Sequence, residues 1–129
     1  MSEKILITGS NSNIAKNLIK FIPKNKFIKK INSNDINFSK LEDIKLQKNF
    51  FLQFNKIFFF HSIIGTKRID FDNVDKINES ISVNLSSQIL ISEYCLQNNK
   101  NAKIFFVGSE SGIKGSYDIV YGLMKSANN

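Results

Sequence analysis

The chain has little of what cross-links or anchors a protein, with one cysteine and one proline among its 129 residues. Because Cys95 is the only cysteine, no internal disulfide can form, which excludes a disulfide scaffold and is typical of a reducing compartment. No apolar run is long enough to cross a bilayer, and no signal-peptide pattern precedes the first apolar residues. We therefore expect a cytoplasmic protein with no membrane partner.

Acidic residues are outnumbered by basic ones, 11 to 18, which gives a net charge of +7. This charge raises the hypothesis of nucleic-acid binding, but the lysines are scattered through every segment and cluster only within residues 24–30. No basic region is interleaved with aromatic residues in the manner of a single-strand binding surface. We therefore predict no nucleic-acid partner, and we expect the charge to help attract an anionic cofactor or substrate.

Apolar runs alternate along the chain with segments of helical period. Runs at residues 5–7, 27–31, 57–60 and 104–107 predict strands, and residues 36–38 predict a further short one. Helices are expected at residues 14–22, closed by Pro23, and at 41–51, and residues 119–127 are expected to begin another. A long helix is also expected, in which Ile77, Ile81, Leu85 and Ile89 form an apolar stripe. This alternation predicts one α/β domain, residues 1–129, with a doubly wound parallel sheet and helices on both faces.

The turn after the first strand, residues 8–15, reads Thr-Gly-Ser-Asn-Ser-Asn-Ile-Ala. Gly9 permits a tight turn, and the small side chains of Ser10 and Ser12 let the backbone approach a pyrophosphate. The helix that follows presents its N–H groups and positive dipole end to phosphate. In such folds ligands sit at the carboxyl ends of the strands, so this turn is a candidate dinucleotide loop. A plain strand-to-helix turn with an Asn cap is the alternative.

A second candidate group follows the last predicted strand. Tyr121 and Lys125 are four residues apart, so on a helix they project from one face. An ammonium group beside the phenol lowers its pKa toward neutrality, which suits Tyr121 to general acid–base work. In the Gly/Ser-rich loop at residues 108–116, Ser109 is the first choice for a hydrogen bond to a substrate carbonyl, and Ser111 is the second.

Taken in chain order, these segments resemble the short-chain dehydrogenase/reductase family. Residues 8–15 resemble its TGxxxGxG motif, with Asn13 and Ala15 in place of the second and third glycines; asparagine best replaces glycine at positive φ. Residues 82–85 resemble its NVN segment, residues 108–112 its SSxxG segment, and residues 121–125 its YxxxK motif. The resemblance implies an NAD(P)-binding Rossmann-type domain and hydride transfer between nicotinamide and a carbonyl or alcohol substrate.

The resemblance also implies individual roles. Tyr121 would be the general acid/base, Lys125 would bind the nicotinamide ribose, Ser109 would hold the substrate, and Asn84 would kink its helix and join a proton relay. The cofactor contacts that it implies are Thr8, Gly9, Ser10, Asn11, Ser12, Asn13, Ile14, Ser33, Ile36, Asn37, His61, Ser62, Tyr121 and Lys125. No metal ligand set is expected.

The role of His61 and the choice between NAD and NADP each need a further remark. His61 departs from the family pattern, and a structural hydrogen-bonding role at the strand end is favoured over catalysis. No carboxylate directly follows the second predicted strand, whereas Lys29, Lys30 and Ser33 lie there, so the cofactor is NAD or NADP with a slight preference for NADP.

The chain stops four residues after Lys125, whereas family members are longer. We therefore expect a Rossmann-type domain incomplete at its C-terminal side, without the substrate-binding part, either as a fragment or as a natural short form whose own activity is open. An exposed sheet edge would favour a partner chain, hence a homo-oligomer. Three functions stay open: an oxidoreductase of carbonyls or alcohols, a nucleotide-sugar reductase, epimerase or dehydratase, and a non-catalytic dinucleotide-binding module. The substrate is not identified.

Overall fold

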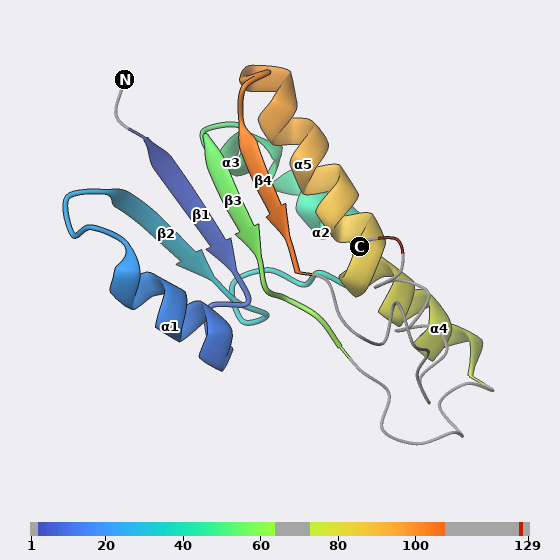
Figure 1. Ribbon diagram of the computed structural model, residues 1–129. Helices are drawn as coiled ribbons and strands as arrows, with labels where there is room; N and C mark the ends of the chain where they lie inside the picture. Colours follow the sequence, from blue (N-terminus) through green and yellow to red (C-terminus); the bar gives the residue numbers. More distant parts are fainter. Residues whose placement is uncertain (1–2, 64–72, 108–126, 128–129) are drawn as a thin grey trace.

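A four-stranded parallel sheet organises the chain in the computed structural model, which describes residues 3–63, 73–107 and 127. The strands are β1 (Lys4–Thr8), β2 (Phe27–Ile31), β3 (Lys56–Phe59) and β4 (Lys103–Phe106), in the spatial order β2-β1-β3-β4. All four arrows in Figure 1 point the same way, so the carboxyl ends of the strands share one edge of the sheet. The predicted parallel α/β sheet is therefore confirmed.

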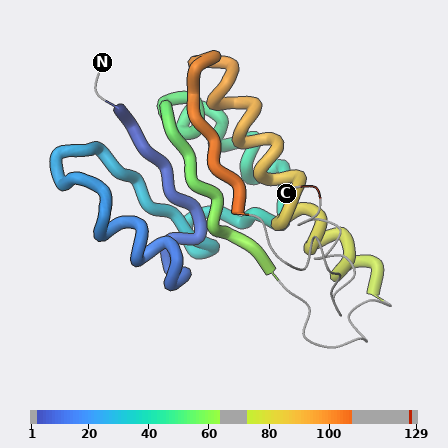
Figure 2. The backbone as a smooth tube through the Cα atoms, viewed as in Figure 1, coloured from blue at the N-terminus to red at the C-terminus, as the bar shows by residue number. Residues whose placement is uncertain are grey.

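Helices cover both faces of this sheet, and each face has its own apolar cluster. Helix α1 (Asn13–Phe21) packs on one face, where Ile5, Ile7 and Ala15 are buried together. Helices α2 (Leu41–Leu46), α3 (Lys48–Phe51) and α5 (Ser87–Asn98) cover the other face, over a larger cluster that includes Leu6, Ile57 and Ile91. Figures 1 and 2 show α1 on the side of the sheet opposite to α5.

The short strand predicted at residues 36–38 does not form, and this prediction is wrong. Ile36 and Phe38 are buried in the core, but the backbone around them runs through turns. The Asn32 side chain accepts a hydrogen bond from Asn34 N–H, and the Asn37 side chain accepts one from Ser39 N–H. These asparagine turns satisfy the backbone locally, so apolar burial is achieved without a strand.

The long helix is present, but its buried face differs from the predicted one. It runs through α4 (Val74–Ile81), a π-helical turn η2 (Ser82–Ser86) and α5. The buried positions include Asn84, Ser87 and Gln88, whereas Ile89, a member of the predicted apolar stripe, is 52% exposed. Polar side chains therefore line much of the inner face because they have partners at the strand ends. Among the described helices, none has both the length and the apolarity to cross a membrane.

Candidate functional site

The strand order reverses between β1 and β3, since the chain builds outward to β2 on one side and to β4 on the other. In an open parallel sheet such a reversal leaves a crevice at the carboxyl ends of the two central strands. A pocket of about 340 Å³ lies there. Its lining comes from the turns after β1, β2 and β3 and from the long helix: Gly9, Asn11, Ser12, Asn32, Ser33, Asn37, Phe38, Ser39, Phe60, His61, Ser62, Ile63, Glu79 and Val83.

The turn after β1 brings bare backbone to the mouth of this pocket. Gly9 has φ +63°, and a Cβ built there would lie 2.5 Å from His61 N and from the Phe60 carbonyl carbon. Only glycine permits both this left-handed conformation and this close approach. Ser12 caps α1 by accepting a hydrogen bond from Ala15 N–H at 3.1 Å.

The first amides of α1 are available to an anion. Among the described residues, the N–H groups of Asn13 and Ile14 have no hydrogen-bond partner. They lie at the positive end of the helix dipole, next to Ser12, which lines the pocket. The turn therefore fits a phosphate group, as a helix N-terminus behind a glycine turn does elsewhere.

One expectation for this turn is wrong: Asn13 does not adopt positive φ, since no described residue other than glycine does. Asn13 is instead the first residue of α1, with an exposed side chain, and Ser12 rather than an asparagine caps the helix. Ala15, which stands in place of the third glycine, is fully buried with Ile5 and Ile7 where α1 meets the sheet.

His61 joins three elements below the pocket. Its Nδ1 lies 2.7 Å from Thr8 Oγ1 at the end of β1, and its Nε2 lies 2.8 Å from Ser87 Oγ at the start of α5. The ring stacks on Phe38, with centroids 3.9 Å apart and planes inclined by 2°. The expected hydrogen-bonding role at the strand end is therefore confirmed, and a cofactor contact by His61 stays a prediction.

Asn84 holds the backbone that follows β3. Its Oδ1 accepts a hydrogen bond from Ile63 N–H and its Nδ2 donates to the Ile63 carbonyl oxygen, both at 2.9 Å. The same Nδ2 donates to Ser80 Oγ at 3.0 Å, and Asn84 is fully buried. It lies inside the π-helical turn, which agrees with the expected local distortion of this helix. The side chain is thus engaged in positioning the turn at residues 60–63.

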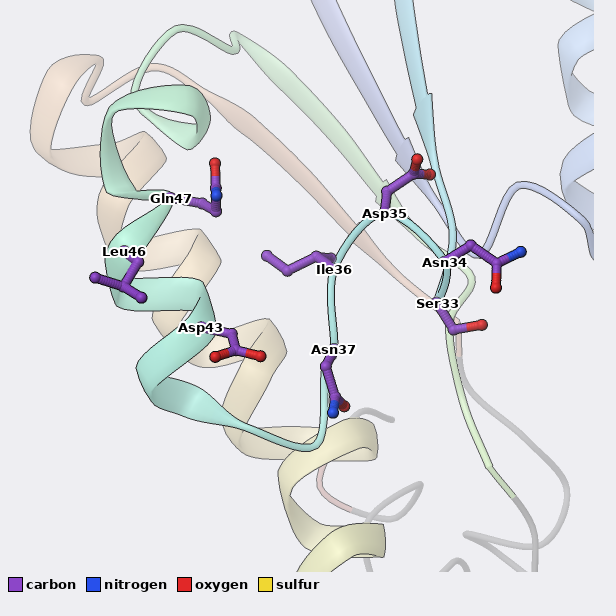
Figure 3. Close-up of a pocket in the computed structure, with 8 residues that line it drawn as sticks. All are labelled: Ser33, Asn34, Asp35, Ile36, Asn37, Asp43, Leu46 and Gln47. Atoms are coloured by element: carbon purple, nitrogen blue, oxygen red, sulfur yellow. The ribbon is translucent and has the colours of Figure 1, made fainter.

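Ile36 and Asn37 occupy different surroundings, although both were predicted as cofactor contacts. Figure 3 shows the Ile36 side chain directed toward α2 and α3, between the loop and Gln47, in a second pocket of about 340 Å³. Asn37 lines both this pocket and the pocket at the strand ends. Asp35, also shown in Figure 3, accepts a hydrogen bond from Asn32 N–H at 2.9 Å, which fixes the turn after β2.

Beside the turn after β1, a further hollow is lined, as far as the described residues go, by two lysines and no carboxylate. Lys16 of α1 and Lys30 of β2 line it together with Ser10, Asn11, Ile19 and Asn32. Lys30 pairs in register with Ile7, which belongs to the α1 face, whereas Lys29 pairs with Leu6, which belongs to the other face. The two adjacent lysines therefore point to opposite sides of the sheet.

The predicted residues Ser109, Ser111, Tyr121 and Lys125 lie outside the described residues. Of the rest, the structure gathers Gly9, Asn11, Ser12, Ser33, Asn37, His61 and Ser62 around one pocket, with Ser10 in the adjoining hollow. Thr8 and Ile36 are buried, Asn84 supports the pocket from behind, and Asn13 and Ile14 offer backbone N–H groups. Sequence reasoning missed Phe38, Glu79 and Val83 as lining residues. It also missed Ser87, because a lone helix serine carries no signal of its partner.

No protein-family model and no curated protein sequence matches the chain. Solved structures match it closely in shape. A bulky-bulky ketone specific alcohol dehydrogenase from Comamonas testosteroni has TM-score 0.83 at 12% identity, covering 98% of this chain and 62% of its own. The second is 4-hydroxyisoleucine dehydrogenase complexed with NADH, with TM-score 0.80 at 20% identity, covering 97% and 63%. The third is a short-chain dehydrogenase from Sphingobium yanoikuyae in complex with NADPH, with TM-score 0.80 at 11% identity, covering 98% and 61%.

This chain thus spans about three fifths of the length of each of these proteins. At such low identity the likeness concerns the backbone, and it agrees with the strand order, the reversal between β1 and β3, and the glycine turn after β1. The chain has the Rossmann-type fold of the short-chain dehydrogenases.

Proposed function

We propose that this chain is the cofactor-binding part of an NAD(P)-dependent oxidoreductase of the short-chain dehydrogenase/reductase type. The observation that carries the proposal is the turn after β1, where Gly9 brings backbone against the end of β3 and two α1 amides stay unpaired beside the pocket. An anionic group fits this cradle, and a side chain at residue 9 would fill it. The neighbours in complex with NADH and with NADPH have the same fold.

Each group of residues has its own role in this proposal. The backbone of residues 9–14 binds the pyrophosphate, while Asn37, His61 and Ser62 contact other parts of the cofactor, as the family resemblance implies. A bound nicotinamide supplies or accepts the hydride. Tyr121 exchanges the proton with the substrate oxygen, with Lys125 lowering the pKa of its phenol and binding the ribose. Ser109 donates a hydrogen bond to the substrate oxygen as charge develops. Asn84 supports this arrangement through the turn at residues 60–63.

Cofactor binding is the first test. Because the chain has no tryptophan, reduced nicotinamide fluorescence is measured without tryptophan emission from the protein. We expect saturable one-to-one binding of NADPH or NADH. No saturation at millimolar cofactor would refute the proposal.

The catalytic assignment is tested separately, in a form of the protein that turns over a carbonyl or alcohol. Tyr121→Phe removes only the phenolic hydroxyl, so it should abolish turnover and leave NADPH affinity within about twofold. An unchanged rate would exclude Tyr121 as the proton donor.

We further propose that NADPH is preferred over NADH. The hollow beside the phosphate turn is lined by Lys16 and Lys30 and by no acidic residue, which suits an additional phosphate on the adenosine ribose. Lys30→Ala should weaken NADPH binding about tenfold and leave NADH binding unchanged, because only NADPH carries that phosphate. Lys29→Ala, on the opposite face of β2, is the matched control. Equal losses for both cofactors would contradict the preference.

Self-association is also proposed, through the outer face of the long helix. Residues 80–92 carry no charged side chain, and within them Ile81 and Leu85 are half-buried and Ile89 is exposed. Two copies packed antiparallel about a two-fold axis at Leu85 would place Ile81 opposite Ile89. The same axis would also place Lys76 beside Glu93 of the other copy. Their positions along the helix axis would differ by about 1.5 Å, the rise of one residue.

Sedimentation velocity tests this interface. Ile89→Glu should give a monomer, whereas Phe21→Glu, on the exposed side of α1, should leave a dimer. A wild-type monomer at high concentration would refute the proposal. We also propose a cytoplasmic setting, in keeping with the single buried cysteine, and a single NAD(P)-binding domain over residues 1–129.

A further inference from the structure

The hydrogen bonds around His61 fix which of its nitrogens carries the proton. Ser87 Oγ donates its one hydrogen to the Val83 carbonyl oxygen at 2.9 Å. Toward His61 Nε2, at 2.8 Å, Ser87 Oγ can therefore only accept, so Nε2 carries a hydrogen. Thr8 Oγ1 accepts a hydrogen bond from Phe60 N–H at 3.3 Å and lies 2.7 Å from His61 Nδ1, to which its own hydroxyl hydrogen can donate.

The result is a one-way chain of hydrogen bonds, from Thr8 to His61 to Ser87 to the Val83 carbonyl. It is buried along its length, since Thr8 and Ser87 are 0% exposed and His61 is 6% exposed. In the neutral imidazole with its proton on Nε2, both ring nitrogens are paired, since Nε2–H donates to Ser87 Oγ and Nδ1 accepts from the Thr8 hydroxyl. Buried networks with every member paired hold a single arrangement.

These hydrogen bonds from Thr8 to Ser87 lie between the two halves of the candidate site. Thr8 directly precedes Gly9 and thus the phosphate turn, and His61 belongs to the turn after β3, which Asn84 holds at Ile63. Gln88 Nε2 donates to the His61 carbonyl oxygen at 3.3 Å and adds a second link to the helix. The imidazole therefore sets the separation between the end of β1 and the long helix, with the pocket above it.

We propose that His61 is a positioning residue of the dinucleotide site: a neutral imidazole in the Nε2–H form that aligns the phosphate turn with the turn after β3. The proposal deepens the proposed function and rests on it, because the alignment matters only for a ligand that spans both turns. A histidine that merely filled space would not require one tautomer. The directional chain does require one.

The chain's single histidine makes the tautomer directly measurable. In ¹⁵N-labelled protein, a long-range ¹H–¹⁵N spectrum of the imidazole contains signals from one residue only. At pH 7.5 we expect a protonated Nε2 and an unprotonated Nδ1. An Nδ1–H form, an imidazolium, or a mixture of tautomers would overturn the proposal.

Affinity is measured in the same samples, at a temperature where each variant is fully folded. Ser87→Ala removes the acceptor of Nε2–H without touching the pocket, and it should raise the Kd for NADPH about tenfold and shift the Nε2 signal. Ser87→Thr keeps the hydroxyl and should restore both. The neighbouring Ser86→Ala, which has no bond to His61, should change neither.

The outcomes separate the two proposals. Wild-type protein that binds NADPH, but whose affinity is unchanged in Ser87→Ala, overturns the positioning role and leaves the proposed function standing. Wild-type protein that shows no saturable NADPH binding overturns the proposed function and the positioning role with it, even where the Nε2–H tautomer is observed.

Discussion

Replacing Gly9 by alanine tests whether the ends of β1 and β3 approach as closely as the site requires. At φ +63° a non-glycine residue costs about 1–2 kcal/mol. The new Cβ would also lie 2.5 Å from His61 N and from the Phe60 carbonyl carbon, so the strand ends must separate. Overpacking of this kind costs about 1–3 kcal/mol. We therefore expect Gly9→Ala to lower the free energy of unfolding by about 2–5 kcal/mol.

Urea unfolding followed by far-ultraviolet circular dichroism measures this change. Asn11→Ala, in the same turn with an exposed side chain, is the matched control and should stay within about 0.5 kcal/mol of the wild type. Gly9→Asn tolerates the left-handed backbone better but keeps the Cβ, so it should recover only part of the loss. A Gly9→Ala protein as stable as Asn11→Ala would refute the close approach, and with it the bare-backbone cradle.

Three further predictions concern the supporting structure. Asn84→Leu leaves the backbone N–H and carbonyl of Ile63 without their side-chain partner, and it should lower the free energy of unfolding by about 2–4 kcal/mol in the same assay. Hydrogen bonding to the Lys56 ammonium lowers the pKa of Glu3, so this pair stabilises the fold at neutral pH. The stability that this ion pair contributes is lost as the pH falls through and below about 4, because Glu3 is then protonated. The difference in Tm between wild type and Glu3→Gln should therefore be smaller at such low pH than at neutral pH. Burial raises the pKa of Cys95 to about 12, so its thiol should resist a disulfide reagent at pH 8 in the native state and react in urea.

Each of these predictions has a contrary result. Asn78→Ala, on the exposed side of α4, controls for Asn84→Leu, and equal losses in both would show that Asn84 does not hold the turn. A Tm difference at Glu3 that grows toward low pH would reverse the sign derived from the pKa. Rapid native-state labelling of Cys95 would contradict its burial.

The continuous apolar strands were the most predictable part of this fold. Residues 5–7, 57–60 and 104–107 have no polar interruption, and runs this short favour strands of a parallel sheet over helices. Ile36 and Phe38 show the limit of that reasoning. Two apolar residues satisfy the core equally well from a turn, and the asparagines at 32 and 37 supply the turn with hydrogen bonds that a strand would not use.

The long helix shows why apolar periodicity predicted the helix but not its buried face. The apolar residues that recur every four positions from Ile77 to Ile89 show the helical period. The burial of Asn84, Ser87 and Gln88, however, depends on hydrogen-bond partners that lie far away in the chain. Asn84 and Ser87 are compatible with the interior because their polar atoms are hydrogen-bonded there, whereas Gln88 is bonded through Nε2 and its buried Oε1 has no partner among the described residues. Such partners emerge only once β3 and the helix are placed side by side.

The candidate site was predictable to a similar extent. The glycine after a buried strand identified the phosphate turn, because both the left-handed backbone and the helix start are local features. Asn13 was expected to stand in for a glycine by its conformation, whereas the helix simply begins there. The link from Thr8 through His61 to Ser87 joins pairs of residues that are 53 and 26 positions apart, so local sequence carried no signal of it.

The most direct test of the account is where the nucleotide binds. Backbone amide signals of ¹⁵N-labelled protein are followed while NADPH is added. Residues 9–14 and 60–63 should shift together along one saturable curve, because the pocket at the ends of β1 and β3 brings these two turns side by side. Saturable shifts confined to the groove around Lys29, Gln47 and Phe50, with none at Gly9 or Ser62, would contradict it.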